Sequence, residues 1–186
     1  MAFPQKRALK EGRTIMFADQ LGFYLLPMVV RTYAPVGKTP ILKENLTRDH
    51  LSAMSGITLE GKLYMIEQER AFKAEDAVRF LKHLMRQIAG KVLVIWDGSP
   101  IHRGGAVKDF LANGASSRLK LEQLPGYAPD LNPDEGVWKH LKCVELKNLC
   151  CQSLSELKVE LRKAKERLRH KRDVILGCIR QPGFVV

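Results

Sequence analysis

Short blocks of apolar residues alternate with polar and turn-forming residues over the first third of the chain, from Thr14 to Ile66. The interruptions fall at Gln20-Leu-Gly, in a stretch rich in Pro and Gly over 33–40, and at Glu60-Gly61. Short apolar runs bounded by such residues are typical of β-strands, and strands joined by tight turns must be antiparallel. We therefore expect strands over 14–18, 23–31, 51–59 and 63–67.

The pattern changes after this region, because apolar residues over 73–88 recur three and four positions apart and predict an amphipathic helix. Val92 to Trp96 is an unbroken apolar run, which is typical of a strand covered on both faces of a sheet. We expect further elements over 104–111 (helix), 119–124 (strand), from about Asp134 (helix), and from a capping box at Ser153 to about Lys171 (helix). Antiparallel strands followed by this alternation predict an α/β fold in which helices flank a mixed sheet.

Composition narrows the class of partner. The chain has 186 residues, enough for one domain with its own core, and carries a net charge of +11 with a pI of about 9.7. Such an excess of positive charge points to nucleic acid or another anionic surface. The apolar run over 21–30 is interrupted by Gly22 and Pro27 and is too short to cross a membrane. With no secretory signal and no paired cysteine spacing typical of zinc, we expect a cytoplasmic, nucleoid-associated protein without a membrane partner.

Three acidic residues stand at the ends of these predicted elements. Asp19 follows the first strand, Asp97 follows the apolar run that ends at Trp96, and Glu135 lies at a helix start. If the first strand and the 92–96 strand are parallel neighbours, their carboxyl ends share one edge of the sheet, where α/β proteins bind ligands. Clustered carboxylates repel one another unless a divalent cation neutralises them, and Mg²⁺ prefers such oxygen ligands. The acids therefore predict metal-assisted phosphoryl transfer on a polyanion.

Two longer motifs contain the second and third acids: Trp96-Asp97-Gly-Ser-Pro-Ile-His102-Arg, and Tyr127-Ala-Pro-Asp-Leu-Asn-Pro-Asp-Glu135-Gly-Val-Trp138. Together with Ile15-Met-Phe-Ala-Asp19, they resemble the catalytic core of DDE transposases of the mariner-type superfamily, particularly its bacterial insertion-sequence branch. The resemblance covers about residues 12–145. It implies a ribonuclease H-like fold with a mixed five-stranded sheet, and it assigns Asp19, Asp97 and Glu135 as catalytic, metal-binding acids. It also implies two Mg²⁺ or Mn²⁺ ions, cleavage at transposon ends and strand transfer into target DNA.

The chain departs from the family pattern at three positions, with Gln20 in place of a frequent acid, Gly98 in place of a frequent Asn and Asp134 in place of an aliphatic residue. Asp134 either perturbs the charge beside Glu135 or offers a rival carboxylate. Family members normally begin with helix-turn-helix domains, for which residues 1–13 are too short. We therefore expect a basic N-terminal arm (1–13), a catalytic domain (14–150) and a basic amphipathic helix with its tail (151–186) packed on that domain.

Several cationic residues are candidates for contact with double-stranded DNA at element ends and target sites. His102 lies one short loop beyond Asp97, where it contacts the DNA backbone or orients the loop. The basic face of the last helix is either a solvated face or a DNA-binding surface. Trp138 is interpreted as a packing residue, with base stacking as the alternative. The candidate DNA-binding residues are His102, Arg103, Lys139, Lys142, Lys158, Arg162, Lys165 and Arg169.

Two other functions remain open at this level. The chain can be an inactive, truncated transposase remnant that only binds DNA, or a nuclease of the same fold that cuts branched or nonspecific DNA without strand transfer. Intact acids favour the enzyme, and the missing recognition domain favours the remnant. The resemblance further suggests a homodimer that pairs two element ends, and a separate helix-turn-helix chain or domain that supplies recognition.

Overall fold

The structure is a computed structural model that describes residues 8, 10–39, 41–42, 47–126 and 129–184. At its centre is a five-stranded mixed sheet in the order β3-β2-β1-β4-β5. The first three strands along the chain pair antiparallel, whereas β4 pairs parallel with both β1 and β5. The strands are β1 (Arg13–Tyr24), β2 (His50–Thr58), β3 (Leu63–Gln68), β4 (Lys91–Trp96) and β5 (Leu119–Gln123). The mixed sheet predicted from the sequence is therefore confirmed.

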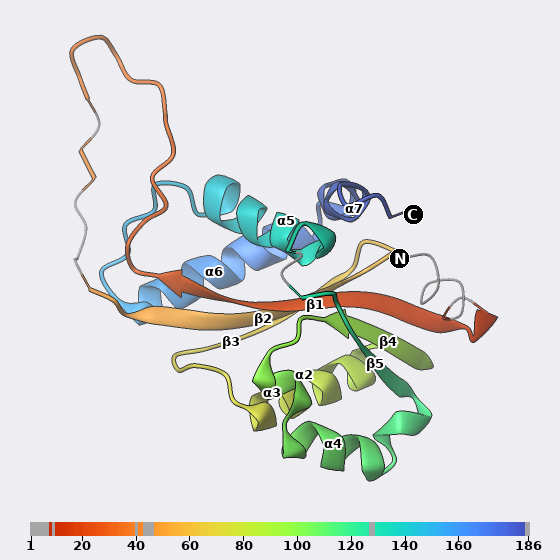
Figure 1. Cartoon of the computed structure of the whole chain (residues 1–186). Helices are drawn as coiled ribbons and strands as arrows, with labels where there is room; N and C mark the ends of the chain where they lie inside the picture. Colours follow the sequence, from red (N-terminus) through yellow and green to blue (C-terminus); the bar gives the residue numbers. More distant parts are fainter. Residues whose placement is uncertain (1–7, 9, 40, 43–46, 127–128, 185–186) are drawn as a thin grey trace.

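Helices cover both faces of this sheet (Figure 1). One face carries α2 (Ala74–Gln87), α3 (Pro100–Arg103) and α4 (Gly105–Ala112), and the other carries α5 (Asp134–His140), α6 (Leu154–Arg169) and α7 (Arg172–Arg180). The described elements also include three short helical segments. Two are 3-10 helices, η1 (Ala115–Ser117) and η2 (Pro129–Leu131), and one is a π-helix, η3 (Leu141–Glu145). Two apolar clusters fill the layers, one around Phe80 and Leu84 of α2, the other around Trp138 and Leu161. Both faces of β4 are thus buried, as its unbroken apolar run requires.

The first strand differs from its prediction. Strands over 14–18 and 23–31 with a turn between them were expected, but β1 runs without interruption from Arg13 to Tyr24. Its register with β2 continues through the predicted turn to the pair of Tyr24 and His50, so the ladder to β2 outweighs the local turn signal. Residues 25–31 are not a strand, and the described part of the segment that follows β1 projects away from the sheet (Figure 1). Pro27 within this segment cannot donate a ladder hydrogen bond.

The C-terminal segment holds two helices where one was predicted. Ser153 caps α6 as expected, because its hydroxyl accepts a hydrogen bond from the Glu156 backbone N–H at 3.2 Å. That helix ends at Arg169, and α7 then packs beside α5 (Figure 1). None of the helices in the described part of the chain is long and apolar enough to cross a membrane.

Arg118, just before β5, closes the carboxyl end of α2. Its guanidinium donates to the backbone oxygens of Met85, Ile88 and Gly90 at 3.2, 2.8 and 2.9 Å. A cation at this end of a helix satisfies otherwise unpaired carbonyls and complements the helix dipole.

We expect Arg118→Met, which keeps most of the aliphatic stem, to lower the free energy of unfolding by about 1 kcal/mol because these charged hydrogen bonds are lost. Urea denaturation measures the change. The neighbouring Lys120→Met, which removes only an exposed ion pair with Glu122, is the control and should cost less than about 0.5 kcal/mol. Equal losses in the two variants would contradict the capping role.

Candidate active site

Two of the predicted acids lie near each other where β4 ends and β1 continues past it. Phe17 of β1 is paired with Ile95 of β4. An aspartate follows each of these residues by two positions: Asp19 lies within β1, and Asp97 lies just beyond the end of β4. Residues two apart along a strand point to the same face, so parallel neighbours bring these two aspartates together. Asp19 is buried at 8% exposure, while nearly half of the Asp97 side chain is exposed.

The third acid comes from helix α5, which packs near these aspartates. Trp138, one turn after Glu135, is buried, and its indole Nε1–H donates to Oδ2 of Asp19 at 3.0 Å. This bond attaches α5 to β1 and keeps the start of the helix near both aspartates. Glu135 itself is exposed and borders a surface cleft of about 510 Å³ between α5 and the end of α7, where Lys139 and Gln181 also lie.

The charges of the other two acids act on Asp19. The pKa of Asp19 is raised from 3.8 to about 7, chiefly by burial and also by the negative charges of Glu135 and Asp97, which together outweigh the hydrogen bonds from the Gln20 backbone and Trp138. A carboxylate held among other carboxylates in this way is stabilised by a cation. Within the described residues, however, no three His, Cys, Asp or Glu side chains lie close enough together to form a ready-made metal centre.

The loop after β4 holds the Asp97 carboxylate by one of its oxygens. Asp97 Oδ1 accepts from the Ser99 backbone N–H at 3.1 Å and lies 2.7 Å from Nδ1 of His102. The hydrogen bond from His102 lowers the pKa of Asp97, and burial opposes this shift only in part. The His102 ring is buried and stacks on Trp96, with ring centroids 4.0 Å apart and an angle of 3° between the planes. This placement favours the loop-orienting role for His102, because the ring offers little surface to DNA.

The family model described as the DDE superfamily endonuclease matches residues 14–158. The chain belongs to the DDE superfamily of endonucleases. Comparison with curated protein sequences gave no significant match.

Solved structures agree on the fold of this DDE superfamily member. The catalytic domain of Mos1 mariner transposase superposes with a TM-score of 0.58 at 15% identity, over 97% of this chain and 89% of that domain. The Mos1 strand transfer complex gives 0.61 at 17% identity, and the Mos1 paired end complex with Mn gives 0.62 at 17%. These two matches cover 97% and 96% of this chain but only 58% and 59% of theirs, so the chain spans less than two thirds of their length. The predicted ribonuclease H-like fold is confirmed.

Asp134, one of the departures from the family pattern, is fully buried and does not face the surface beside Glu135. The Ser55 hydroxyl, on the strand paired with β1, donates to Asp134 Oδ2 at 2.6 Å, whereas Oδ1 has no hydrogen-bond partner among the described residues. Burial raises the pKa of Asp134 well above 3.8, and the charge of Asp19 raises it further. Burial therefore favours the neutral form of Asp134, which is not a carboxylate exposed on the surface beside Glu135.

Replacing Asp134 by Asn should stabilise this DDE domain as pH rises. The pKa of Asp134 is raised in the folded protein. The stability that proton binding contributes is therefore fully present below about pH 3.8, and it is lost as the pH rises towards the pKa of the folded state. We expect Asp134→Asn to gain about 1 kcal/mol over the wild type at pH 7, with little difference at pH 4. Urea denaturation at both pH values tests this. The substitution Asp130→Asn, at an exposed acid, is the control, and a pH-independent effect of Asp134→Asn would contradict the raised pKa of Asp134.

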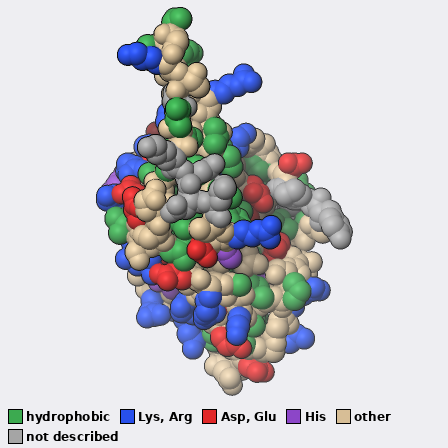
Figure 2. Space-filling view, turned by 90° about the vertical axis from the view of Figure 1, so that its left-hand side faces the viewer, with side chains coloured by type: hydrophobic (Ala, Val, Ile, Leu, Met, Phe, Trp, Pro, Cys, Tyr) green, Lys and Arg blue, Asp and Glu red, His purple; other side chains and the backbone are tan. Residues whose placement is uncertain are grey.

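The predicted DNA-binding residues fall into two groups. Those on α6 already contact acids of the same chain: Lys158 pairs with Glu69 at 3.3 Å, Arg162 and Lys165 pair with Glu67 at 2.6 and 3.6 Å, and Arg169 pairs with Glu166 at 3.1 Å. On the face shown in Figure 2, both blue and red side chains occur. These pairs favour the interpretation of α6 as a helix packed on the sheet.

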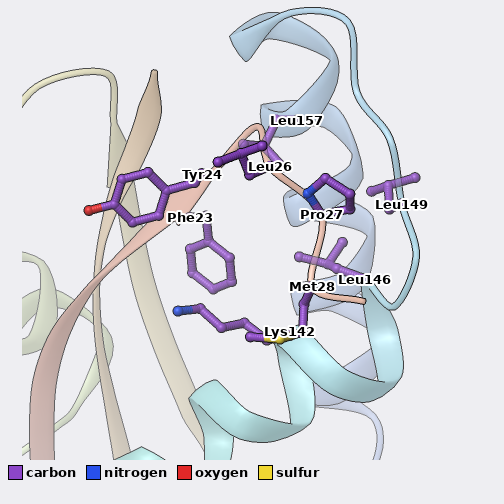
Figure 3. A pocket seen from close by; sticks show the side chains of 9 residues that line it. All are labelled: Phe23, Tyr24, Leu26, Pro27, Met28, Lys142, Leu146, Leu149 and Leu157. Atoms are coloured by element: carbon purple, nitrogen blue, oxygen red, sulfur yellow. The ribbon is translucent and has the colours of Figure 1, made fainter. Parts of the chain in front are cut away.

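The second group lies near the acids. Arg103 at the end of α3 and Lys139 on α5 are exposed. Lys142 follows Glu135 by two helical turns and lines a pocket of about 140 Å³ at the base of the segment after β1, with its Nζ 5.7 Å from the centre of the Phe23 ring (Figure 3). Burial lowers the pKa of Lys142, and the charge of Glu135 opposes that shift.

Sequence reasoning missed three contributors to this site. The hydrogen bond from Trp138 to Asp19 was not foreseen, although a Trp one turn after Glu135 was a signal that could have suggested it. Ser55 and Gln123 carried no such signal. The Gln123 amide lies where a side chain at Gly98 would point, because a Cβ there would come within 2.4 Å of Gln123 Nε2. The family motif includes Tyr127, which lies outside the described residues.

Proposed function

We propose that this chain is a transposase catalytic domain that cleaves DNA at transposon ends and transfers the freed 3′ end into target DNA. One observation carries the proposal: in a DDE superfamily member, Asp97 and Glu135 lie close enough to Asp19 for their charges to add to burial, the larger cause, in raising the pKa of Asp19 to about 7. Acids whose mutual repulsion is relieved by a cation suit phosphoryl transfer.

The donor set fits divalent metal ions. All three acids offer carboxylate oxygens, which Mg²⁺ and Mn²⁺ prefer, and substrate phosphates typically complete such sites. Asp19, Asp97 and Glu135 would hold two ions, with Trp138 and His102 fixing the first two acids through one oxygen each. When bound, such ions activate the attacking oxygen and stabilise the leaving oxygen of an in-line displacement. The Mos1 comparisons include paired end complexes with Mn and with Mg.

The path of the DNA follows the exposed side of α5 rather than α6. Lys139 lies one turn after Glu135 and Lys142 about two turns after it, so both can neutralise backbone phosphates on either side of a scissile bond. The cleft of about 510 Å³ beside Glu135 is lined by Lys139 as well. DNA contact by Arg162 of α6 would instead break its ion pair with Glu67.

Assembly and origin form part of the same proposal. Two protomers would pair two element ends, as the term paired end complex describes for Mos1. Recognition of the ends would come from a helix-turn-helix segment or a separate chain. We assign the chain to the bacterial insertion-sequence branch on its motifs, and we expect it to act in the nucleoid.

The remnant that binds DNA without cutting it is the second candidate. It is favoured by the lack of a ready-made metal centre among the described residues. The nuclease without strand transfer is distinguished from the transposase by its products.

The test is cleavage of labelled duplex DNA carrying the element's own ends, with Mg²⁺ or Mn²⁺, by the wild type and by Asp97→Ala. The transposase should give metal-dependent nicks at the ends and joined products with target DNA, and Asp97→Ala should give neither. Cleavage of branched or random duplexes without joined products would indicate the nuclease. Equal DNA binding by both proteins without cleavage, even with a recognition segment restored, would establish the remnant.

A further inference from the structure

Packing alone does not explain why the buried residue 102 is a histidine. It is 4% exposed, its Nε2 has no hydrogen-bond partner among the described residues, and an apolar ring would stack on Trp96 equally well. Its only hydrogen-bonding atom in use is Nδ1, which lies 2.7 Å from Oδ1 of Asp97 and 3.2 Å from the Asp97 backbone oxygen. The side chain is therefore directed at one aspartate and at nothing else that the structure describes.

The chemistry of these contacts assigns the proton. A backbone oxygen and an ionised carboxylate oxygen can only accept hydrogen bonds, so Nδ1 must carry the hydrogen that it shares between them. With the Ser99 backbone N–H also donating to Oδ1, that oxygen receives two donors. Among the described residues, no hydrogen bond reaches the other oxygen, Oδ2. The carboxylate is thus held by one oxygen with the other left for a ligand.

Trp96 makes this arrangement rigid. The stacked rings lie 4.0 Å apart and almost parallel, and Trp96 is itself buried at the end of β4. Helix α3 turns the chain back after Ser99, which places His102 against the residue immediately before Asp97. A ring packed in this way cannot easily rotate, so the direction of its N–H, and with it the rotamer of Asp97, is set by the core.

We propose that His102 is a positioning residue that orients Asp97, so that Oδ2 faces the cation. The inference rests on the proposed function, because it needs a metal at Asp97. It assigns to His102 a hydrogen bond to the carboxylate ligand, and to Trp96 the support of the ring. Partners that orient a metal ligand typically change metal affinity by about 10-fold to 100-fold when they are lost.

Three substitutions separate the hydrogen bond from the packing. His102→Phe keeps a ring that can stack on Trp96 and removes the donor. His102→Asn keeps an amide N–H near the position of Nδ1 and loses the rest of the ring. His102→Gln carries the same amide one bond further out, near the position of Nε2, where it no longer reaches Asp97 Oδ1.

The readout is the affinity for Mn²⁺ alone, measured by electron paramagnetic resonance of the free ion with the whole chain in the absence of DNA. Thermal unfolding checks that each variant is folded. We expect His102→Phe and His102→Gln to bind Mn²⁺ about 10-fold to 100-fold more weakly than the wild type, and His102→Asn to stay within about threefold of it. Cleavage by the Phe variant should recover as the Mn²⁺ concentration is raised.

The inference is overturned if the Phe variant binds Mn²⁺ as the wild type does, or if the Asn and Gln variants lose affinity equally. The comparison of Asn with Gln stands even if the Phe variant does not fold. Wild-type affinity for Mn²⁺ separates this result from a failure of the proposed function. If the wild type binds no Mn²⁺ with or without DNA, the metal-dependent function itself is wrong, and the role of His102 is lost with it.

Discussion

Replacing Glu135 by Gln is expected to lower the rate of metal-dependent DNA cleavage by about 10³-fold, while the protein stays folded and still binds DNA. The substitution preserves the size of the side chain and removes its charge. Glu135 is exposed at the first turn of α5, so the core does not depend on it. A metal ion contributes several kcal/mol to the stabilisation of the transition state, and each 1.36 kcal/mol corresponds to a factor of ten in rate. Single-turnover cleavage of a labelled duplex measures the effect.

The matched control for this substitution is Asp109→Asn. Asp109 is also an exposed acid on a helix, but α4 lies on the opposite face of the sheet from α5 (Figure 1). We expect this variant to cleave within about twofold of the wild type. A Glu135→Gln protein that cleaves at the wild-type rate would remove Glu135 from the site. Loss of cleavage in both variants would point to a general effect of charge on DNA binding.

The second large effect concerns stability. Glu145, at the end of η3, receives hydrogen bonds from Arg167 Nε at 2.6 Å and from Lys171 Nζ at 2.7 Å, and His140 Nε2 lies 3.4 Å away. Its side chain is only 4% exposed, although the two cations are nearly half exposed. These contacts join the helical segment that carries Glu135 to α6 and to the start of α7. We expect Glu145→Gln to lower the free energy of unfolding at pH 7 by about 2 kcal/mol, allowing for screening of the exposed partners.

The pH dependence of that loss follows from the pKa. Burial alone would raise the pKa of Glu145, but hydrogen bonds and charges from Lys171 and Arg167 outweigh it and lower the pKa from 4.5 to about 2. Because the folded value is depressed, the contribution is fully present above about pH 4.5 and is lost as pH falls towards 2. The wild type and Glu145→Gln should therefore become more alike in urea denaturation at pH 3 than at pH 7.

Glu160→Gln is the comparison for Glu145→Gln. It removes a surface ion pair with Lys163 on the same helix, at 2.7 Å, and should cost less than about 0.5 kcal/mol. A difference between wild type and Glu145→Gln that stays constant from pH 7 to pH 3 would show that the lost energy comes from packing and not from charge.

Several elements could be predicted from the sequence, because they depend on local patterns. Helix α2 was expected over 73–88 and runs from Ala74 to Gln87, and the strand over 92–96 is β4. The capping box at Ser153 needs only residues three apart. The nearness of Asp19 and Asp97 followed once the two strands were assumed to be parallel neighbours, although Asp19 lies inside β1 and not at its carboxyl end.

Local patterns failed where a distant partner decided the outcome. Pairing with β2 carried β1 through the Gln20-Leu-Gly turn signal, and packing against α5 supplied the partner for α7. Charge patterns likewise could not show that Arg162 of α6 pairs with Glu67, 95 positions away. The basic face of that helix therefore looked free in the sequence and is largely paired in the fold.

The sequence by itself predicted most of the elements and their order, and it singled out three candidate acids, because periodicity and capping are properties of neighbouring residues. Only the tertiary structure decided how those acids are held. Trp138 reaches Asp19 across 119 positions, and Ser55 reaches Asp134 across 79. Such contacts depend on topology and on the exclusion of water from the core, which raises the pKa values of Asp19 and Asp134. Neither the long-range topology nor the exclusion of water can be predicted from the local order of residues along the chain.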